Sequence, residues 1–465
     1  MRQTNFALAL LAAAVLTACG GSDNNNSAAS APKPQLAAEV TFGDSLSDVG
    51  TYAVGTVAAL GGGKFTINGN NTAINAGLHG KNWTELLAAQ LSLSAPCAAV
   101  TGLEGDALQG FAVPVKNNLT CTNYAQGGAR VTNPIGPSNK ALQSPIGALT
   151  YPVAKQIATH LSRTGGSFKP TDVVIVMAGG NDLLMLTAGL TAAAQAAGAA
   201  AGAKAGAEAF AKSLTTLLAA GATNPSTAAT AIGTAIATES ARPGSTGTTL
   251  VGAAVQAAAT QPGNSAVGSP AVYGPMVGKA QADAGAAGAT AGASAGAAYG
   301  AANGPALVPQ MAAAGAELAA LIRNEIVAKG ATHVVLNNLP DVGSTPYAKA
   351  QSASSQQLVA GMVSAFNIAL RVGIDGLEDK VLFVDLFTSS QDQFANPAKY
   401  GISNVTTPAC GANKLGTTSL VCNGSNIINT SVGGYLFADD VHPSPLGQSL
   451  IAKSVAEAMV AKGWL

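Results

Sequence analysis

The sequence is poor in charged and aromatic side chains. Only 10% of its 465 residues are Asp, Glu, Lys or Arg, where about 25% is usual for a soluble domain, and only 5% are aromatic. This composition excludes a charge-rich disordered chain and a long charged coiled coil. Lys and Arg number 23, as do Asp and Glu, so the net charge is zero and no basic stripe could neutralise phosphates. We therefore expect no nucleic-acid partner.

The apolar run near the amino terminus is too short to span a membrane as a helix. It extends from Phe6 to Ala18 after Arg2, well under the roughly 20 residues that a spanning helix needs, and fits the apolar region of a secretory signal peptide. The run ends in Leu16-Thr17-Ala18-Cys19, which resembles the bacterial lipobox, in which the cysteine is lipidated and becomes the mature amino terminus.

The lipobox resemblance predicts a lipoprotein signal peptide at 1–18 and a flexible, polar tether at 19–37. It implies a cell-envelope protein held on the membrane by a lipid on Cys19. The absence of Asp directly after that cysteine favours the outer membrane, on its periplasmic or its surface face. The alternative is a secreted protein whose signal peptide carries an incidental cysteine.

Cysteine is scarce, and its spacing does not suggest a metal site. Beyond Cys19 the chain has four cysteines, an even number that fits disulfides in an oxidising compartment. Proximity in the sequence favours Cys97 with Cys121 and Cys410 with Cys422, although four cysteines allow three connectivities. No CxxC or HExxH spacing is present, so we expect no metal and no organic cofactor.

Short apolar runs alternate with helical patterns over most of the remaining chain, which is typical of a parallel sheet covered by helices. Such strands are apolar throughout because both faces of the sheet are buried. The sequence therefore predicts an α/β, three-layer domain over 38–465. The expected strands are 39–42, 172–177, 332–336 and 381–385, and the expected helices include 83–91, 308–329, 356–372 and 446–462.

Residues 187–305 interrupt this alternation with a segment dominated by Ala, Gly, Thr and Ser. Gly198, Gly202 and Gly206 recur every fourth residue, and so do five glycines from Gly288 to Gly304. This spacing places each set on one helical stripe and predicts two helices whose backbones approach closely. We expect a water-soluble helical cap that borders the site and shapes its access.

A candidate nucleophile follows the first expected strand. Gly43-Asp44-Ser45-Leu46 stands where a strand passes into a turn, and a serine there can expose its hydroxyl at the carboxyl edge of the sheet. A second serine, in Gly292-Ala293-Ser294-Ala295-Gly296, matches the G-x-S-x-G pattern of a strand-to-helix nucleophile turn. That motif requires a preceding strand, and none is expected in the Ala/Gly tract.

A serine nucleophile needs a base, and the chain has four histidines. His160 falls in an amphipathic helical pattern, His333 opens a strand, and His79 lies in a loop without a nearby acid. His442 differs because Asp439 precedes it by three residues. On one turn this carboxylate can orient the imidazole towards a serine.

Acyl transfer also needs donors for the developing oxyanion. Asn181, in Gly179-Gly180-Asn181-Asp182, offers a side-chain amide after the strand at 172–177. A second glycine pair, Gly127-Gly128, can bring a backbone N–H close to a substrate.

Together these blocks resemble the GDSL or SGNH hydrolase family, in its bacterial lipase and esterase branch. They occur in the family's order: Gly43 to Ser45, the glycines ending at Gly128, Gly179 to Asp182, and Asp439 to His442. The resemblance implies the flavodoxin-like αβα fold of that family.

The resemblance also implies a role for each site residue. Ser45 would be the nucleophile, His442 the base and Asp439 its orienting acid. The N–H groups of Ser45 and Gly128 and the side chain of Asn181 would form the oxyanion hole. The expected activity is hydrolysis of ester or lipid substrates through an acyl-enzyme. The alternatives are a phospholipase, a glycan O-deacetylase, or a non-enzymatic adhesion or scaffold lipoprotein.

Overall fold

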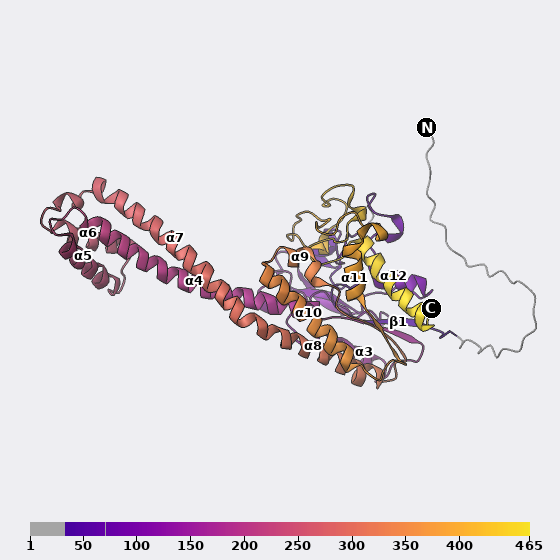
Figure 1. Cartoon of the computed structure of the whole chain (residues 1–465). Coiled ribbons are helices and arrows are strands. Elements are labelled where there is room, and N and C mark those ends of the chain that lie inside the picture. The colour runs from indigo at the N-terminus through magenta and orange to yellow at the C-terminus, as the bar shows by residue number, and fades with distance from the viewer. Residues whose placement is uncertain (1–32, 70) are drawn as a thin grey trace, which may run out of the picture.

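The computed structural model describes residues 33–69 and 71–465. The predicted signal peptide, most of the tether and Cys19 lie outside these residues. A four-stranded parallel sheet forms the centre of the main body (Figure 1). Its strands are β1 Ala38–Gly43, β4 Asp172–Met177, β5 His333–Asn337 and β6 Val381–Val384, in the order β1-β4-β5-β6. The four strands predicted from the sequence are confirmed, with small differences at their ends.

Helices cover both faces of this sheet. One face packs against α3 Val153–Arg163, α8 Leu307–Leu321 and α10 Ala353–Gly373. The other packs against α2 Trp83–Gln90 and α12 Pro445–Lys462. Alternate residues of β4, β5 and β6 enter the two cores, because successive side chains point to opposite faces. In β4, Val174 and Val176 lie in the first core, while Val173, Ile175 and Met177 lie in the second. The three-layer prediction is confirmed.

The remaining elements of the body are short. α8 continues as a π-helical segment, Ile322–Val327, and three small helices are α1 Gly55–Ala59, α9 Pro346–Lys349 and α11 Leu386–Ala395. An antiparallel hairpin, β2 Val100–Glu104 with β3 Ala112–Asn117, forms a second sheet. Turns of 3₁₀ helix occur at Ala76–Leu78, Lys140–Leu142, Gly304–Ala306, Val342–Ser344, Pro397–Tyr400, Ser419–Val421 and Val432–Gly434. One more, Ser265–Gly268, lies within the Ala/Gly-rich segment.

Two disulfides join the cysteines in the pairing that proximity favours. Cys97 bonds Cys121, with Cα atoms 5.1 Å apart, and Cys410 bonds Cys422, with Cα atoms 5.9 Å apart. The first bridge closes the segment that contains the β2–β3 hairpin.

The Ala/Gly-rich segment forms a long arm that projects from the body (Figure 1). Its shaft consists of α4 Gly180–Ala219 and α7 Pro270–Asn303, and its tip of α5 Pro225–Ser240 and α6 Gly247–Ala259. The tip has a hydrophobic core of its own, which includes Leu214, Ile232 and Val255. This core explains how the tip is ordered away from the body.

The glycine stripes lie where α4 and α7 touch, as the four-residue spacing predicts. A Cβ atom built on Gly198 would lie 2.7 Å from the carbonyl oxygen of Gly292, and one on Gly202 would lie 2.8 Å from that of Gly288. Both distances are too short for any side chain, so only glycine permits this backbone approach. The rival G-x-S-x-G match, Gly292 to Gly296, therefore belongs to the shaft and has a packing role there.

Candidate active site

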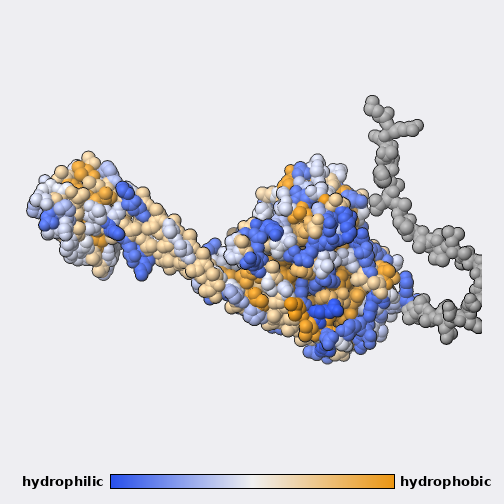
Figure 2. Space-filling model, viewed as in Figure 1, coloured by the Kyte–Doolittle hydropathy of each residue, from blue (hydrophilic) through white to orange (hydrophobic). Residues whose placement is uncertain are grey.

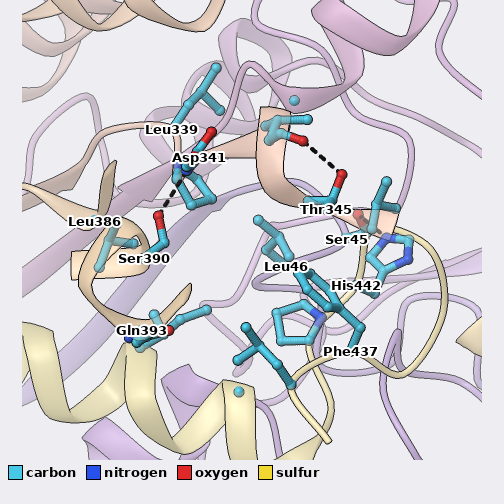
Figure 3. Close-up of a pocket in the computed structure, with 18 of the residues that line it drawn as sticks. Ser45, Leu46, Leu339, Asp341, Thr345, Leu386, Ser390, Gln393, Phe437 and His442 are labelled. Atoms are coloured by element: carbon cyan, nitrogen blue, oxygen red, sulfur yellow. Dashed lines mark hydrogen bonds between the residues drawn. The ribbon is translucent and has the colours of Figure 1, made fainter. Parts of the chain in front are cut away.

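Ser45 stands in a tight turn directly after β1. Gly43, the last residue of that strand, allows the turn because a Cβ atom there would lie 2.4 Å from the carbonyl oxygen of Met177. The side chain of Gln156 accepts a hydrogen bond from the N–H of Gly43 and donates one to its carbonyl oxygen. These contacts hold Ser45 at the carboxyl edge of the sheet, where its side chain lines a pocket (Figure 3).

Three of the predicted site residues form one hydrogen-bonded chain. Ser45 Oγ lies 2.8 Å from His442 Nε2, and His442 Nδ1 lies 2.8 Å from Asp439 Oδ2. Asp439 Oδ1 also accepts the N–H of His442 at 2.8 Å, so the carboxylate holds both the backbone and the ring of the histidine. This arrangement can pass the Ser45 proton to the imidazole and stabilise the resulting imidazolium.

The other histidines lie away from this chain. His160 is buried between the rings of Phe42, Tyr124 and Phe168, and burial lowers the pKa of its side chain to about 4. His333 packs against Trp464. These two positions agree with the structural roles expected from the sequence.

Burial and charge act in opposite directions on the two ionisable partners. Burial lowers the pKa of His442, but the charge and hydrogen bond of Asp439 outweigh it, so the net pKa lies above 6.5. For Asp439, burial raises the pKa, but the charge and hydrogen bond of His442 and the N–H of Ser419 bring it well below its usual range. The pair therefore favours a charged carboxylate next to an imidazole that gains a proton readily.

The three proposed oxyanion donors have polar hydrogens that are free to meet a ligand. Gly128 has φ +80°, and a Cβ atom there would lie 2.6 Å from the carbonyl oxygen of Pro137, so the position requires glycine. Within residues 33–69 and 71–465, the N–H groups of Ser45 and Gly128 donate no hydrogen bond. Asn181 Nδ2 donates one hydrogen to the carbonyl oxygen of Ala129 at 2.9 Å, which leaves the second hydrogen available.

Buried aspartates hold the oxyanion segments in place, and the sequence analysis did not identify them. Asp48 Oδ2 accepts the N–H of Gly127 at 2.9 Å. Asp182 accepts the N–H of Val131 at 3.0 Å and pairs with Arg130 at 2.9 Å. Asp182 stands in the quoted block next to Asn181, and Asp48 follows Ser45 by three residues; that proximity was the available clue.

Asp44 is a further acidic group at the site. It is buried, it lines the same pocket as Ser45, and its Oδ1 accepts the N–H of Leu46 at 3.0 Å. Burial raises the pKa of this carboxyl group to about 7, against the opposing effects of that hydrogen bond and of the charge of His442. Within the described residues, no group of three or more His, Cys, Asp or Glu side chains is placed to hold a metal ion.

The Cys410–Cys422 bridge lies close to the acid of the site. The N–H of Ser419 donates to Asp439 Oδ2 at 2.7 Å, and the N–H of Cys410 donates to the carbonyl oxygen of Ala438 at 2.9 Å. The disulfide therefore ties together two segments that both contact the Asp439 loop.

The pocket beside Ser45 and His442 is mainly apolar. Its walls come from the Ser45 turn, the start of α4, the loop after β5, α11, the loop before His442, and α12. The apolar side chains that line it are Leu46, Leu184, Leu339, Val342, Leu386, Phe394, Leu436, Phe437, Val441 and Ile451. An apolar cavity next to a nucleophile suits a hydrocarbon chain.

The arm does not form the cap that the sequence suggested. Among the described residues, those lining the pocket include Gly180, Asn181 and Leu184 from the start of α4, and none from 187–305. The helix leaves the body in line with its first turn and carries the rest of the segment away (Figure 1). The expectation of a bordering cap is therefore wrong in its placement.

The shaft has an apolar surface along most of its length (Figure 2). Among the described residues, two helical stretches are long and apolar enough to cross a membrane by length and composition: α4, and the continuous helical run from Pro270 to Val327. The prediction that the segment is water-soluble stays a prediction.

Comparison with known proteins gives matches over most of the chain. The family model described as GDSL-like Lipase/Acylhydrolase matches residues 40–257 and 286–455. The Arabidopsis thaliana protein GDSL esterase/lipase APG is 26% identical over 141 residues, which are 28% of this chain and 40% of that protein. GDSL esterase/lipase At5g45960 from the same plant is 22% identical over 130 residues, or 25% of this chain and 34% of that protein.

A bacterial relative is similar over a longer stretch. The Pseudomonas putida protein named "Uncharacterized protein in trpE-trpG intergenic region" is 29% identical over 164 residues, which are 33% of this chain and 25% of that protein. The chain thus spans less than half the length of each of these three curated relatives.

Proposed function

The chain belongs to the GDSL-like lipase/acylhydrolase family, and we propose that it is a serine hydrolase of carboxylic esters that works through an acyl-enzyme. The observation that carries the proposal is the hydrogen-bonded chain from Ser45 through His442 to Asp439, with distances of 2.8 Å at both links. A nucleophile, a base and an orienting acid in this order are what acyl transfer requires.

The proposed reaction has two steps. Ser45 Oγ attacks the ester carbonyl while His442 Nε2 takes its proton, and the N–H groups of Ser45 and Gly128 with the amide of Asn181 stabilise the oxyanion. The imidazolium then gives its proton to the departing alcohol, which leaves an acyl-Ser45 ester. Water, deprotonated by His442, attacks that ester and releases the carboxylic acid.

The apolar lining of the pocket supports acyl chains over acetylated glycans as substrates. Glycan O-deacetylation needs room for a small acetyl group and polar contacts to a sugar, whereas this pocket presents mainly aliphatic and aromatic side chains. We therefore rank fatty-acyl esters, including lipids and phospholipids, first.

The proposal can be tested with para-nitrophenyl esters from acetate to palmitate, together with a fluorophosphonate that labels activated serines. We expect hydrolysis well above the buffer rate and one covalent adduct on the peptide that contains Ser45. No hydrolysis of any ester, acetylated glycans included, would favour the scaffold alternative.

Asn181→Ala should lower kcat by about 10²–10³-fold, because the loss of one oxyanion donor removes stabilisation that exists only in the transition state. KM should change little for the same reason. Steady-state kinetics on one para-nitrophenyl ester, with thermal unfolding as a check of integrity, would measure both effects. A folded variant with kcat close to wild type would remove Asn181 from the oxyanion hole.

Removing the outer arm should leave the chain-length preference unchanged, since no residue of 187–305 is among the described residues that line the pocket. A short Gly/Ser linker can replace residues 195–295, because a Cβ atom on Gly296 would lie only 3.2 Å from the carbonyl oxygen of Ala194. We expect kcat/KM within about threefold of wild type for both short and long acyl esters. A folded deletion variant that selectively lost activity on long-chain esters would contradict this expectation and support a role of the arm as a cap.

We also propose that Cys19 anchors the protein in the cell envelope, on the evidence of the lipobox resemblance alone. Cys19→Ser should abolish incorporation of a labelled fatty acid and leave an uncleaved precursor, while wild type is labelled. One acyl chain alone binds a membrane only marginally, so stable attachment requires the several acyl chains of a lipoprotein anchor. Equal labelling of the variant would exclude this residue.

A further inference from the structure

The wall of the active-site pocket contains several polar side chains that the proposed mechanism does not use, and one of them carries an amide. Gln393, on α11, lines the pocket and is only 8% exposed. In Figure 3 it lies on the opposite side of the drawn pocket from Ser45 and His442. Its position across an apolar space from the nucleophile raises the question of what its amide binds.

The other polar side chains around the pocket are already engaged. Ser389 Oγ donates to the carbonyl oxygen of Asp385, Ser390 Oγ to that of Phe387, and Thr345 Oγ1 to that of Val342. Within residues 33–69 and 71–465, the amide of Gln393 is not among the polar groups that are cut off from solvent and lack a partner, so it stays accessible from the pocket that Gln393 lines. An amide that is accessible from a pocket can exchange its hydrogen bonds with water for hydrogen bonds with a ligand.

The surroundings of Gln393 make a ligand the natural partner. The same wall includes Leu386, Phe394 and Ile451, whose side chains offer no hydrogen-bonding atom. An amide carries both donors and an acceptor, so a hydroxyl group can satisfy it in either direction. Pockets of this kind take an apolar ligand and use a few placed polar groups to select it.

We propose that Gln393 selects esters whose hydrocarbon chain carries a hydroxyl group some carbons away from the ester bond. This inference rests on the proposed ester hydrolysis and specifies its substrate class. The hydroxyl can belong to the acyl chain or to the alcohol, since either part of an ester could enter the pocket next to Ser45. The chemistry that Gln393 recognises is the same in both cases.

The test compares hydroxylated and plain esters of equal length. One series contains para-nitrophenyl octanoate and its hydroxyoctanoate isomers. The other contains octyl acetate and its hydroxyoctyl isomers, and its hydrolysis is measured from the acid that is released. The measured quantity is the ratio of kcat/KM for each hydroxylated ester to that of the plain ester. For wild type we expect a ratio of about tenfold at the best position, the value of one neutral hydrogen bond. The series in which it appears identifies the part of the ester that fills the pocket.

Gln393→Leu keeps a similar volume and removes the amide, so its ratio should fall to about one or below, with the plain ester hydrolysed at least as well as by wild type. Gln391→Leu is the matched control, because Gln391 lies two residues earlier on α11 and is exposed; its ratio should equal that of wild type. If Gln393→Leu does not fold, Gln393→Met serves the same purpose.

Two results would overturn the inference. One is a wild-type ratio near one at every position in both series, and the other is a ratio that Gln393→Leu leaves unchanged. A merely structural role for Gln393 would lower both esters equally and belongs to the second result. In both cases hydrolysis of plain esters above the Ser45→Ala background would leave the proposed function standing. If the wild-type protein hydrolysed every ester only at the Ser45→Ala rate, the proposed function and the inference would both be wrong.

Discussion

Replacing Ser45 with alanine should lower kcat by about 10⁶-fold, which is the size of effect seen when a serine hydrolase loses its nucleophile. Without Oγ no acyl-enzyme can form. His442 Nε2 also loses the hydroxyl group that lies 2.8 Å from it in the wild-type protein. The residual rate should come from binding and from the oxyanion donors alone. Measurement of kcat with saturating para-nitrophenyl butyrate would show the loss.

Two companion variants sharpen this result. His442→Ala should lose about as much as Ser45→Ala, and the double variant should lose no more, because the two side chains act as one unit. Ser47→Ala is the matched control: it lies in the same loop, it is fully buried, and its hydroxyl has no hydrogen-bond partner within the described ranges. Additive losses in the double variant would contradict the paired role, and an active Ser45→Ala would contradict the nucleophile.

Asp439→Asn should lower kcat by about 10⁴-fold while leaving the fold intact. The carboxylate accepts the N–H and the ring Nδ1 hydrogen of His442, and it stabilises the imidazolium that forms during the reaction. An asparagine can hold the ring in the wrong tautomer, with Nε2 protonated and unable to act as a base. Steady-state kinetics and unfolding curves of the variant would separate the catalytic loss from any loss of stability.

The pH dependence of the same variant has a defined sign. In wild type the activity should fall as the pH drops through the pKa of His442, which lies above 6.5, because the protonated ring cannot accept the Ser45 proton. Without the charge of Asp439, burial dominates and the pKa of His442 falls, so the acid limb of kcat/KM should move to lower pH.

Asp440→Asn is the control for this pH prediction. Asp440 is exposed, and its charge raises the pKa of His442 without a hydrogen bond to the ring. We expect a small shift of the acid limb in the same direction and a loss of activity below about tenfold. A larger loss with Asp440→Asn than with Asp439→Asn would show that Asp440, and not Asp439, is the acid that orients His442.

Several parts of the fold and of the site follow from the sequence because their determinants are local. A strand buried on both faces must be apolar throughout, so 172–177 was recognisable without its partners. Asp439 and His442 lie within one turn of each other, so their contact depends on three residues of chain. Ser45 and His442 are 397 positions apart, and only Ser45 was expected at the carboxyl edge of the sheet. Their pairing was expected from the resemblance to the family, not from a local pattern. The glycine stripes likewise predicted the contact of two helices, since a four-residue period places glycines on one line.

Only the tertiary structure decides where those local features point. The course of the arm depends on the direction in which α4 leaves the sheet, and nothing in its Ala and Gly composition encodes that direction, which is why the expected cap lies elsewhere. The composition of the pocket wall depends on which face of α11 turns inward. A helix of ten residues with mixed composition has no strong hydrophobic periodicity from which that face could be predicted. Gln393 and Gln391 are therefore alike in the sequence and differ only in burial. Their difference arises from packing among segments distant in the chain, which no local pattern records.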